Sequence, residues 1–293
     1  MPMHYYPIKE RFPRLEELRD SHIVIKFGAN AIAGEDELKR FAKDVAMMCS
    51  LGMHPVLVHG GGPEITKEMK LRGLEARKVA GLRITDSETL EVAEYVLGRM
   101  NREIVKALRG AGVDAVGVPG YKNGILRCKR KDPILAYDEN GNLVTIDLGY
   151  VGDVEFVDIK QIMYMTASGM VPVIYPIGED VEGGHVNVNA DTAAAHIAAA
   201  LNCEEMILIT DVPGILTDVN DENSLIREVS IKQIDELISG GVVKEGMVPK
   251  VEACRLALNA GVRSTYMLGG KEAGNLLRQI LDDNHSGTRI VKG

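Results

Sequence analysis

The 293-residue sequence lacks any hydrophobic run that approaches the roughly 20 residues a transmembrane helix requires. It also starts without the apolar segment of a secretion signal. Positive charge is in deficit, since 34 Lys and Arg stand against 42 Asp and Glu, for a net charge of −8. A surplus of Lys and Arg is what binds a nucleic-acid backbone, so this charge disfavours a general nucleic-acid partner. These absences predict a cytoplasmic protein that works without a membrane or a nucleic acid.

Cysteine is scarce and scattered along the chain. Cys49, Cys128, Cys203 and Cys254 form no C-x-x-C pair. Free thiols in a reducing compartment are therefore favoured over a zinc site or disulfides. We expect no metal site built from side chains.

What the sequence does have is an alternation of short apolar runs with longer amphipathic stretches. Six runs rich in Val and Ile and bounded by Gly, Pro or Asp are typical of strands: residues 23–26, 55–58, 115–118, 171–176, 206–209 and 264–268. Six stretches with helical periodicity lie between them: residues 36–51, 63–72, 87–111, 159–168, 192–201 and 249–260. Repeated strand–helix–strand order predicts an α/β fold with a mainly parallel sheet covered by helices on both faces.

Three segments depart from this alternation. Residues 125–154 contain Glu139-Asn140-Gly141-Asn142 between two β-like runs, which predicts a hairpin. The Gly-rich residues 178–185 are the best candidate for a hinge between two lobes, residues 22–183 and 184–293. The extension at residues 1–21 has too many apolar residues for a solvated tail and too few for a core, and Pro13 can begin a helix in it.

Three glycines, Gly60, Gly61 and Gly62, stand between a predicted strand and a helix that begins at Pro63. Glycine lets the backbone approach a ligand closely, and a helix N-terminus supplies free N–H groups. This favours an anion site over a plain tight turn. Neither a G-x-x-x-x-G-K-[ST] P-loop nor a G-x-G-x-x-G fingerprint occurs, so a dinucleotide fold is disfavoured.

Two lysines and one aspartate are candidates for chemistry on such an anion. Lys26 ends an apolar strand just before Gly28, and Lys250 lies where a helix is expected to start. Phosphoryl transfer needs positive charge and N–H donors around the moving group, with one carboxylate to organise them. Asp191 could be that carboxylate, although from its position alone a helix cap is the better interpretation. His59 could be a base, but a lone histidine beside a glycine turn is more often structural.

Seven motifs together resemble the acetylglutamate kinases of the amino acid kinase family. In chain order they are VIKFGANAI, VLVHGGGPEI, GLRITDSETLEVAEYVLGRMNREIV, DLGYVGDVE, NVNADTAAAHIAAAL, LITDVPGIL and EGMVPKVEA. The resemblance spans about residues 22–290. It implies an open αβα sandwich with two lobes, and transfer of the γ-phosphoryl of ATP to the side-chain carboxylate of N-acetyl-L-glutamate in arginine biosynthesis. Mg²⁺ would arrive with ATP, held mostly by phosphates and water.

The resemblance also implies roles for single residues. Lys26 and Lys250 would stabilise the phosphoryl group in flight, with Asp191 holding both lysines. The residues implied to bind substrate are Gly61, Gly62, Arg83 and Asn187, of which Arg83 would grip the α-carboxylate with a two-pronged contact. The residues implied to bind the nucleotide are Gly28, Asp211, Gly214, Gly246 and Met247.

The same resemblance implies a lobe for each substrate and an oligomer. The lobe at 22–183 would bind the acyl amino acid and form a homodimer, and the lobe at 184–293 would bind ATP. The extension at 1–21 resembles a helix that interlaces three such dimers into a hexamer, and the alternative is an arm packed on its own subunit.

Three residues depart from the family pattern. Ala29 stands where a second glycine is usual, and Gln279 and Tyr266 differ from the arginine-inhibited members. Other interpretations stay open at this point: the same chemistry on an aminoadipate derivative or on glutamate, or a non-catalytic sensor that retains the fold.

Overall fold

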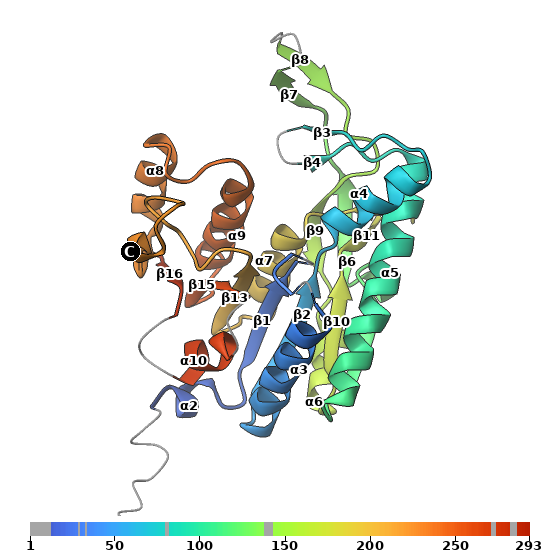
Figure 1. Cartoon of the computed structure of the whole chain (residues 1–293). Helices are drawn as coiled ribbons and strands as arrows, with labels where there is room; N and C mark the ends of the chain where they lie inside the picture. The colour runs from blue at the N-terminus through green and yellow to red at the C-terminus, as the bar shows by residue number, and fades with distance from the viewer. Residues whose placement is uncertain are drawn as a thin grey trace, which may run out of the picture.

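The computed structural model describes residues 13–28, 30–32, 34–79, 82–137, 143–270, 274–281 and 286–293. Its central feature is an eight-stranded sheet with the strand order β14-β16-β15-β13-β1-β2-β10-β5 (Figure 1). The strands of this sheet are β1 (His22–Phe27), β2 (His54–His59), β5 (Ala115–Pro119), β10 (Val171–Tyr175), β13 (Glu205–Thr210), β14 (Glu228–Ser230), β15 (Ser264–Gly269) and β16 (Thr288–Val291). Pairing is parallel except between β15 and β16.

Helices cover both faces of this sheet (Figure 1). One layer comprises α3 (Glu35–Ser50), α5 (Ser87–Gly110) and α10 (Asn275–Leu281), and the other comprises α6 (Lys160–Ala167), α7 (Ala190–Ala200) and α9 (Val248–Asn259). Side chains alternate along β1 between the two layers, because successive residues of a strand point to opposite faces. Ile23 and Ile25 enter one core and Val24 the other. The predicted αβα sandwich around a mainly parallel sheet is confirmed.

A smaller sheet and two hairpins lie within residues 78–187. The sheet has the order β12-β11-β6-β9. Its strands are β6 (Leu126–Arg130), β9 (Gly152–Val157), β11 (Ile177–Asp180) and β12 (His185–Asn187), and the hairpins pair β3 (Lys78–Val79) with β4 (Leu82–Arg83) and β7 (Ile134–Tyr137) with β8 (Leu143–Ile146). The β7–β8 pair confirms the hairpin expected within residues 125–154, whose turn at 138–142 lies outside the described residues.

The segment expected to be a hinge, residues 178–185, is part of a β-hairpin. β11 and β12 pair through it in antiparallel register, and β11 also pairs with β6. The eight-stranded sheet carries strands from before and after this segment. The role of this segment as a hinge between two lobes remains a prediction.

The remaining helices are α2 (Pro13–Leu18), α4 (Gly62–Leu71) and α8 (Ile231–Ser239), with short 3₁₀ turns at Lys122–Gly124, Glu222–Ser224 and Glu245–Met247. α2 begins at Pro13 as expected and packs against α10, with Leu18 buried. Its Arg14 contacts the Glu205 carboxylate, the Gln279 carbonyl oxygen and, at 3.4 Å, the Tyr266 hydroxyl. The described part of the extension thus packs on its own subunit. Residues 1–12 and Ala29 lie outside the described residues.

The four cysteines are free, as predicted, and three of them are buried. Within the described ranges, no three His, Cys, Asp or Glu side chains are grouped so that they could hold a metal ion. Across those same ranges, no helix is long and apolar enough to span a membrane.

Candidate active site

A cavity of about 570 Å³ lies at the carboxyl ends of four adjacent strands, β13, β1, β2 and β10. After β1 the chain adds β2, β5 and β10 on one side of it, and later β13, β15 and β16 on the other. Ligands of open α/β sheets bind at such a reversal, in the crevice beyond the carboxyl ends of the strands. The segments that follow these strands bring Gly28, Gly60–Gly62, Pro176 and Asp211 into the cavity wall.

Lys26 lies in the cavity because of the alternation along β1. Ile25 and Phe27 point toward α3, so Lys26 points toward α7. Only 7% of Lys26 is exposed, and its Nζ lies 2.7 Å from Asp191 Oδ1. A buried ammonium group needs such a partner, because removing an unpaired charge from water is costly.

Asp191 is not the helix cap that its sequence position favours. The cap of α7 is Asn189, whose side-chain oxygen accepts hydrogen bonds from the backbone N–H groups of Asp191 and Thr192. Asn189 and Asp191 are both good capping residues, but the helix begins at Ala190, two residues earlier than a cap at Asp191 would require. With capping done by Asn189, the Asp191 carboxylate is left for the lysines.

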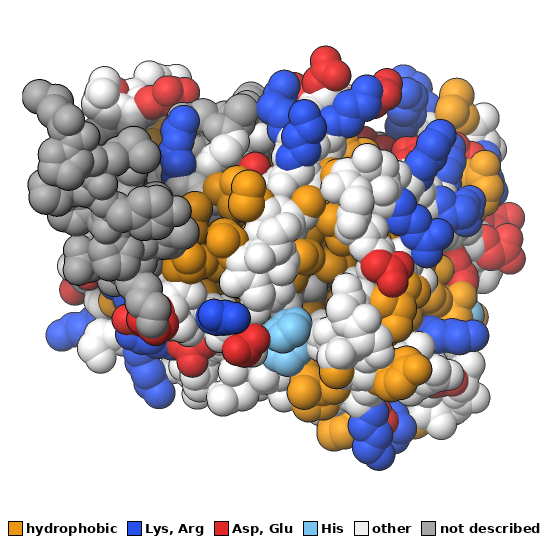
Figure 2. Space-filling model, turned by 90° about the horizontal axis from the view of Figure 1, so that it is seen from below, with side chains coloured by type: hydrophobic (Ala, Val, Ile, Leu, Met, Phe, Trp, Pro, Cys, Tyr) orange, Lys and Arg blue, Asp and Glu red, His pale blue; other side chains and the backbone are white. Residues whose placement is uncertain are grey.

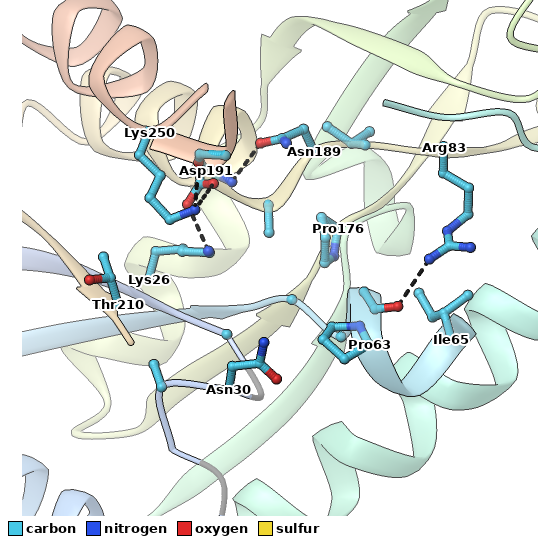
Figure 3. A pocket seen from close by; sticks show the side chains of 18 of the residues that line it. Lys26, Asn30, Pro63, Ile65, Arg83, Pro176, Asn189, Asp191, Thr210 and Lys250 are labelled. Atoms are coloured by element: carbon cyan, nitrogen blue, oxygen red, sulfur yellow. Dashed lines mark hydrogen bonds and ion pairs between the residues drawn. The ribbon is translucent and has the colours of Figure 1, made fainter. Parts of the chain in front are cut away.

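Lys250 completes a group of two cations around one carboxylate. Its Nζ lies 3.9 Å from Asp191 Oδ2 and donates a hydrogen bond of 3.0 Å to the Gly246 carbonyl oxygen. Figure 3 shows Lys26 and Lys250 reaching Asp191 from different elements, β1 and α9. Two positive charges against one negative charge make this end of the cavity attractive to an anion.

The glycine turn forms the opposite wall. Gly61 caps α4 and Gly62 is the first residue of the helix, followed by Pro63 as expected. A Cβ on Gly61 would lie 2.7 Å from Met100 Sδ and 3.0 Å from Leu97 Cδ2, whereas one on Gly62 would meet nothing within 4 Å. Gly61 therefore allows the turn to pack on α5, and Gly62 leaves open space at a helix N-terminus, where N–H groups lack helical partners.

Arg83 is buried beside this turn, with 7% exposed. Its guanidinium donates to the Gly62 carbonyl oxygen at 3.0 Å and to the Thr66 hydroxyl at 2.7 Å, as Figure 3 shows in part. Burial lowers the pKa of Arg83 from its ordinary value. Among the described residues it has no carboxylate partner, and it lines the cavity. A buried, positively charged fork in this state can bind a carboxylate.

Asn187 is the last residue of β12, whereas Arg83 is the last residue of β4. The side-chain amide of Asn187 donates a 3.4 Å hydrogen bond to the Thr85 hydroxyl, and its backbone N–H donates to the Tyr150 carbonyl oxygen at 2.8 Å. Asn187 lines the cavity. The structure thus brings together all four residues predicted to bind substrate.

Four of the five residues predicted to bind the nucleotide also line the cavity: Gly28, Asp211, Gly246 and Met247. Gly214 does not. It is buried, and a Cβ there would lie 2.6 Å from Thr288 Oγ1 and 2.8 Å from Leu225 Cδ1. Close packing alone thus accounts for a glycine at 214.

His59 is structural, as its position beside a glycine turn favoured. It is fully buried, with Nε2 3.1 Å from Asn101 Nδ2 and Nδ1 3.2 Å from the Gly60 carbonyl oxygen. Burial lowers its pKa to about 4, although the contact with Gly60 opposes the shift. A neutral imidazole bonded on both sides is not available as a base.

Four polar residues of the cavity wall were not predicted from the sequence: Asn30, Lys78, Asn189 and Thr210. Asn30 lies just after β1, and Thr210 is the last residue of β13. The rule that ligand sites form at the carboxyl ends of strands could therefore have predicted both. Lys78 lies directly opposite Arg83 in the β3–β4 register, and that pairing is visible only in the structure.

Comparison with known proteins assigns the chain to a family. Residues 21–269 match the model of the amino acid kinase family. The chain belongs to this family. It is 41% identical over 284 residues to the acetylglutamate kinase of Methanococcus maripaludis (strain C6), with 97% of this chain and 96% of that protein covered. It is also 41% identical over 286 residues to the acetylglutamate kinase of Symbiobacterium thermophilum, again with 97% and 96% covered.

Solved structures share the fold at lower identity. N-acetylglutamate synthase from Neisseria gonorrhoeae, complexed with coenzyme A and N-acetyl-glutamate, superposes with a TM-score of 0.81 at 23% identity. That likeness covers 96% of this chain and 62% of the synthase, so the chain spans less than two thirds of that protein. Carbamate kinase from Giardia lamblia bound to AMP-PNP gives a TM-score of 0.64 at 15% identity, with 93% and 99% covered.

Proposed function

We propose that this protein transfers the γ-phosphoryl group of ATP to the side-chain carboxylate of N-acetyl-L-glutamate. The products are N-acetylglutamyl 5-phosphate and ADP, and the reaction is the second step of arginine biosynthesis in the cytoplasm. The observation that carries the proposal is the pairing of Lys26 and Lys250 on Asp191 opposite a glycine turn and a buried Arg83. The near-full-length similarity to acetylglutamate kinases supports the choice of substrate.

The reaction needs positioning and charge stabilisation rather than a base. One oxygen of the acceptor carboxylate, already ionised at neutral pH, attacks the γ-phosphorus, and the bond to the oxygen that bridges the β- and γ-phosphates breaks with its electron pair left on ADP. Lys26 and Lys250 would compensate the negative charge on the transferring group, while Asp191 keeps both ammonium groups in place. The buried, neutral His59 plays no part in proton transfer.

The acceptor would lie between the glycine turn and Arg83. The N-terminal N–H groups of α4, at Gly61 and Gly62, face the reacting carboxylate or the phosphoryl group in this proposal. Arg83 then grips the α-carboxylate and Asn187 makes a second contact with the bound amino acid. Both side chains line the same cavity as the two lysines.

ATP enters with Mg²⁺ as its substrate complex. Asp191 is engaged by Lys26 at 2.7 Å, which makes it a poor metal ligand. The proposal therefore leaves Mg²⁺ to the phosphates and water, as is usual for this ion. The proposed nucleotide contacts are Gly28, Asp211, Gly246 and Met247. Gly214 is included in the proposal only because it matches the family motif.

The proposal includes a division of labour and an assembly. Residues 22–183 bind the acyl amino acid and form the homodimer, and residues 184–293 bind ATP. The extension joins dimers into a hexamer of three dimers. Figure 2 shows hydrophobic side chains in the middle of the lower face, between rims of Lys and Arg, and α2 lies toward that face in Figure 1. Exposed apolar surface of this kind suits a subunit contact.

An ADP-release assay over a panel of acceptors tests the function. The panel comprises N-acetyl-L-glutamate, L-glutamate and N-acetyl-L-2-aminoadipate at equal concentration. We expect the highest kcat/KM for N-acetyl-L-glutamate. A preference for another acid would replace the substrate, and no acceptor-dependent ADP release from the folded protein would favour a non-catalytic sensor.

A further inference from the structure

One face of α5 supports the acceptor half of the cavity at successive points. Asn101 holds His59 and the Val173 carbonyl oxygen, at 3.1 and 2.9 Å. Leu97 and Met100 lie where a Cβ on Gly61 would clash. Residues three, four or seven apart share a helix face, so Glu94 lies on the same face, one turn before Leu97. The Asn101 contact fixes the strand before the glycine turn, and Leu97 and Met100 fix the turn itself.

Glu94 is the centre of a polar cluster that the proposed reaction does not use. His185 Nδ1 lies 3.2 Å from Glu94 Oε2, and the His185 ring stacks on the Tyr121 ring with centroids 3.9 Å apart and planes 18° apart. Burial raises the pKa of both Tyr121 and Tyr175, and the charge of nearby Glu94 raises both further. Side chains from α5, from the segment after β5, from the end of β10 and from β12 therefore meet here.

Two of these elements, β10 and β12, lead directly to a cavity residue. Tyr175 precedes Pro176, which lines the cavity and accepts a hydrogen bond from the Val188 N–H at 3.0 Å. His185 is two residues before Asn187 on β12, so both side chains point to the same face of that strand. A rotation of β12 would move both together.

β12 is weakly held at its first residue. It is three residues long and follows an exposed turn at 181–184, with Gly183 at φ +82°. Among the described residues, the outer edge of β12 makes only an isolated bridge at Asn187, with Val151, and His185 pairs with Glu179 of β11 alone. The His185 side chain thus provides, through Glu94 and Tyr121, the link between the start of β12 and α5.

We propose that His185, held by Glu94 and Tyr121, is a positioning residue that sets the orientation of Asn187 toward the acyl amino acid. The inference rests on the proposed function, because it assigns Asn187 to the acceptor. The proposal implies that the cluster affects the binding of one substrate only. Loss of the cluster raises the KM for the acyl amino acid and leaves the KM for MgATP unchanged. Small errors of placement at a reacting centre are costly, so a rise of roughly 10-fold is expected.

Three variants of one residue separate the contributions. His185→Ala removes the ring and the hydrogen bond, His185→Phe keeps a ring against Tyr121 but cannot reach Glu94, and His185→Gln keeps an N–H donor without the stack. We expect Ala to raise the KM for N-acetyl-L-glutamate most, with Phe and Gln between Ala and wild type. His22→Asn is the matched control, since His22 is also a partly buried histidine that contacts a side chain, Thr166 at 3.0 Å, and a ring, His54, but lies at the amino end of β1. It should leave both KM values within 2-fold.

Steady-state kinetics in both substrates and a thermal melt decide the outcome. If His185→Ala melts earlier but keeps the wild-type KM for N-acetyl-L-glutamate, the cluster is merely structural and the inference is wrong. If kcat and both KM values change alike, it is also wrong. Glu94→Gln probes the same contact from α5 and gives a second test if His185→Ala does not fold. Failure of the proposed function would be seen separately, as a wild-type protein without N-acetyl-L-glutamate-dependent turnover.

Discussion

At the scale of single residues, the proposed function depends on cationic side chains that the fold positions to bind anions. Lys26 is buried against Asp191, whereas Lys250 is partly exposed and contacts both Asp191 and a backbone carbonyl oxygen. Arg83 has hydrogen-bond partners but, within the described part of the chain, no carboxylate. The site is thus assembled around charge that the substrates would neutralise.

Replacing either lysine with alanine should reduce turnover far more than it changes folding. A donor that stabilises transition-state charge is typically worth about 10²- to 10³-fold in rate, so we expect kcat to fall at least 100-fold for Lys26→Ala and for Lys250→Ala. ADP release measures kcat, and circular dichroism measures the fold. Lys39→Ala, which removes an exposed lysine paired with Glu35 on α3, should retain full activity. Near-normal turnover in either variant would remove that lysine from the chemistry.

Arg83→Lys should weaken binding of the acyl amino acid and leave MgATP binding alone. The charge survives, but the planar fork is lost, and a hydrogen bond to a charged group is worth about 1.5–3 kcal/mol, or roughly 10- to 150-fold in affinity. The KM values for the two substrates provide the measurement. Arg72→Lys, on the exposed end of α4, is the matched control. An unchanged KM for the acyl amino acid would mean that Arg83 does not bind it.

At the scale of elements, the sequence predicts what depends on local pattern and misses what depends on pairing. All six expected strands and all six expected helices are present, because their apolar periodicity is strong. The cap of α7 was placed on Asp191 because two capping residues compete there, and only the backbone conformation decides for Asn189. β14 and β16 were missed because strands of three and four residues offer too little pattern.

The same limit applies to the site. Lys26, Gly61 and Gly62 could be predicted because each stands at a strand end or a helix start, where ligand sites form. Lys250 is likewise a candidate because it stands at an expected helix start, whereas Arg83 and Asn187 receive their roles only from the resemblance, since nothing local distinguishes them. The contacts of Asn101 and Glu94 with residues 42 and 91 positions away could not be read from the sequence at all.

The buried contact between His59 of β2 and Asn101 of α5 leads to a prediction about how the stability of the protein depends on pH. Because burial lowers the pKa of His59 to about 4 from its ordinary value near 6.5, the unfolded chain binds a proton at a higher pH than the folded protein does. Stability linked to His59 is therefore fully present above about pH 6.5 and is lost as the pH falls toward 4. At 1.36 kcal/mol per pH unit, the loss at pH 5 is roughly 2 kcal/mol.

His59→Asn isolates this contribution. The variant loses stability at every pH through its missing contacts, but the loss due to protonation disappears. Denaturant unfolding at pH 8 and pH 5 should therefore show the wild type losing about 2 kcal/mol more than the variant between the two. Equal losses would show that His59 is not held neutral by the fold.

At the scale of the whole molecule, the N-terminal extension joins distant parts of the chain. α2 lies against α10, and Arg14 reaches Glu205 at the start of β13. Burial raises the pKa of Glu205, and the charge of Arg14 opposes that shift. Part of the extension therefore belongs to the subunit's own core, which fits either a single arm or a helix that also contacts another dimer.

Light scattering on a chain that starts at Ser21 tests the assembly. We expect the full-length protein to form a particle larger than a dimer and the shortened chain to form a dimer. Since the shortened chain also leaves Glu205 without Arg14, full-length Arg14→Gln controls for that loss and should keep the larger mass. Equal masses for the full-length and shortened chains would rule out the interlacing role.

The central claim is that the two lysines held by Asp191 move a phosphoryl group from ATP to the side-chain carboxylate of N-acetyl-L-glutamate. The most direct measurement is ³¹P NMR of the reaction mixture, which distinguishes an acyl phosphate from ATP, ADP and inorganic phosphate. We predict an acyl-phosphate signal that grows with ADP only when N-acetyl-L-glutamate is present and that Lys26→Ala abolishes. ADP accompanied by inorganic phosphate alone from the outset, or the same acyl phosphate from the folded Lys26→Ala protein, would contradict the account.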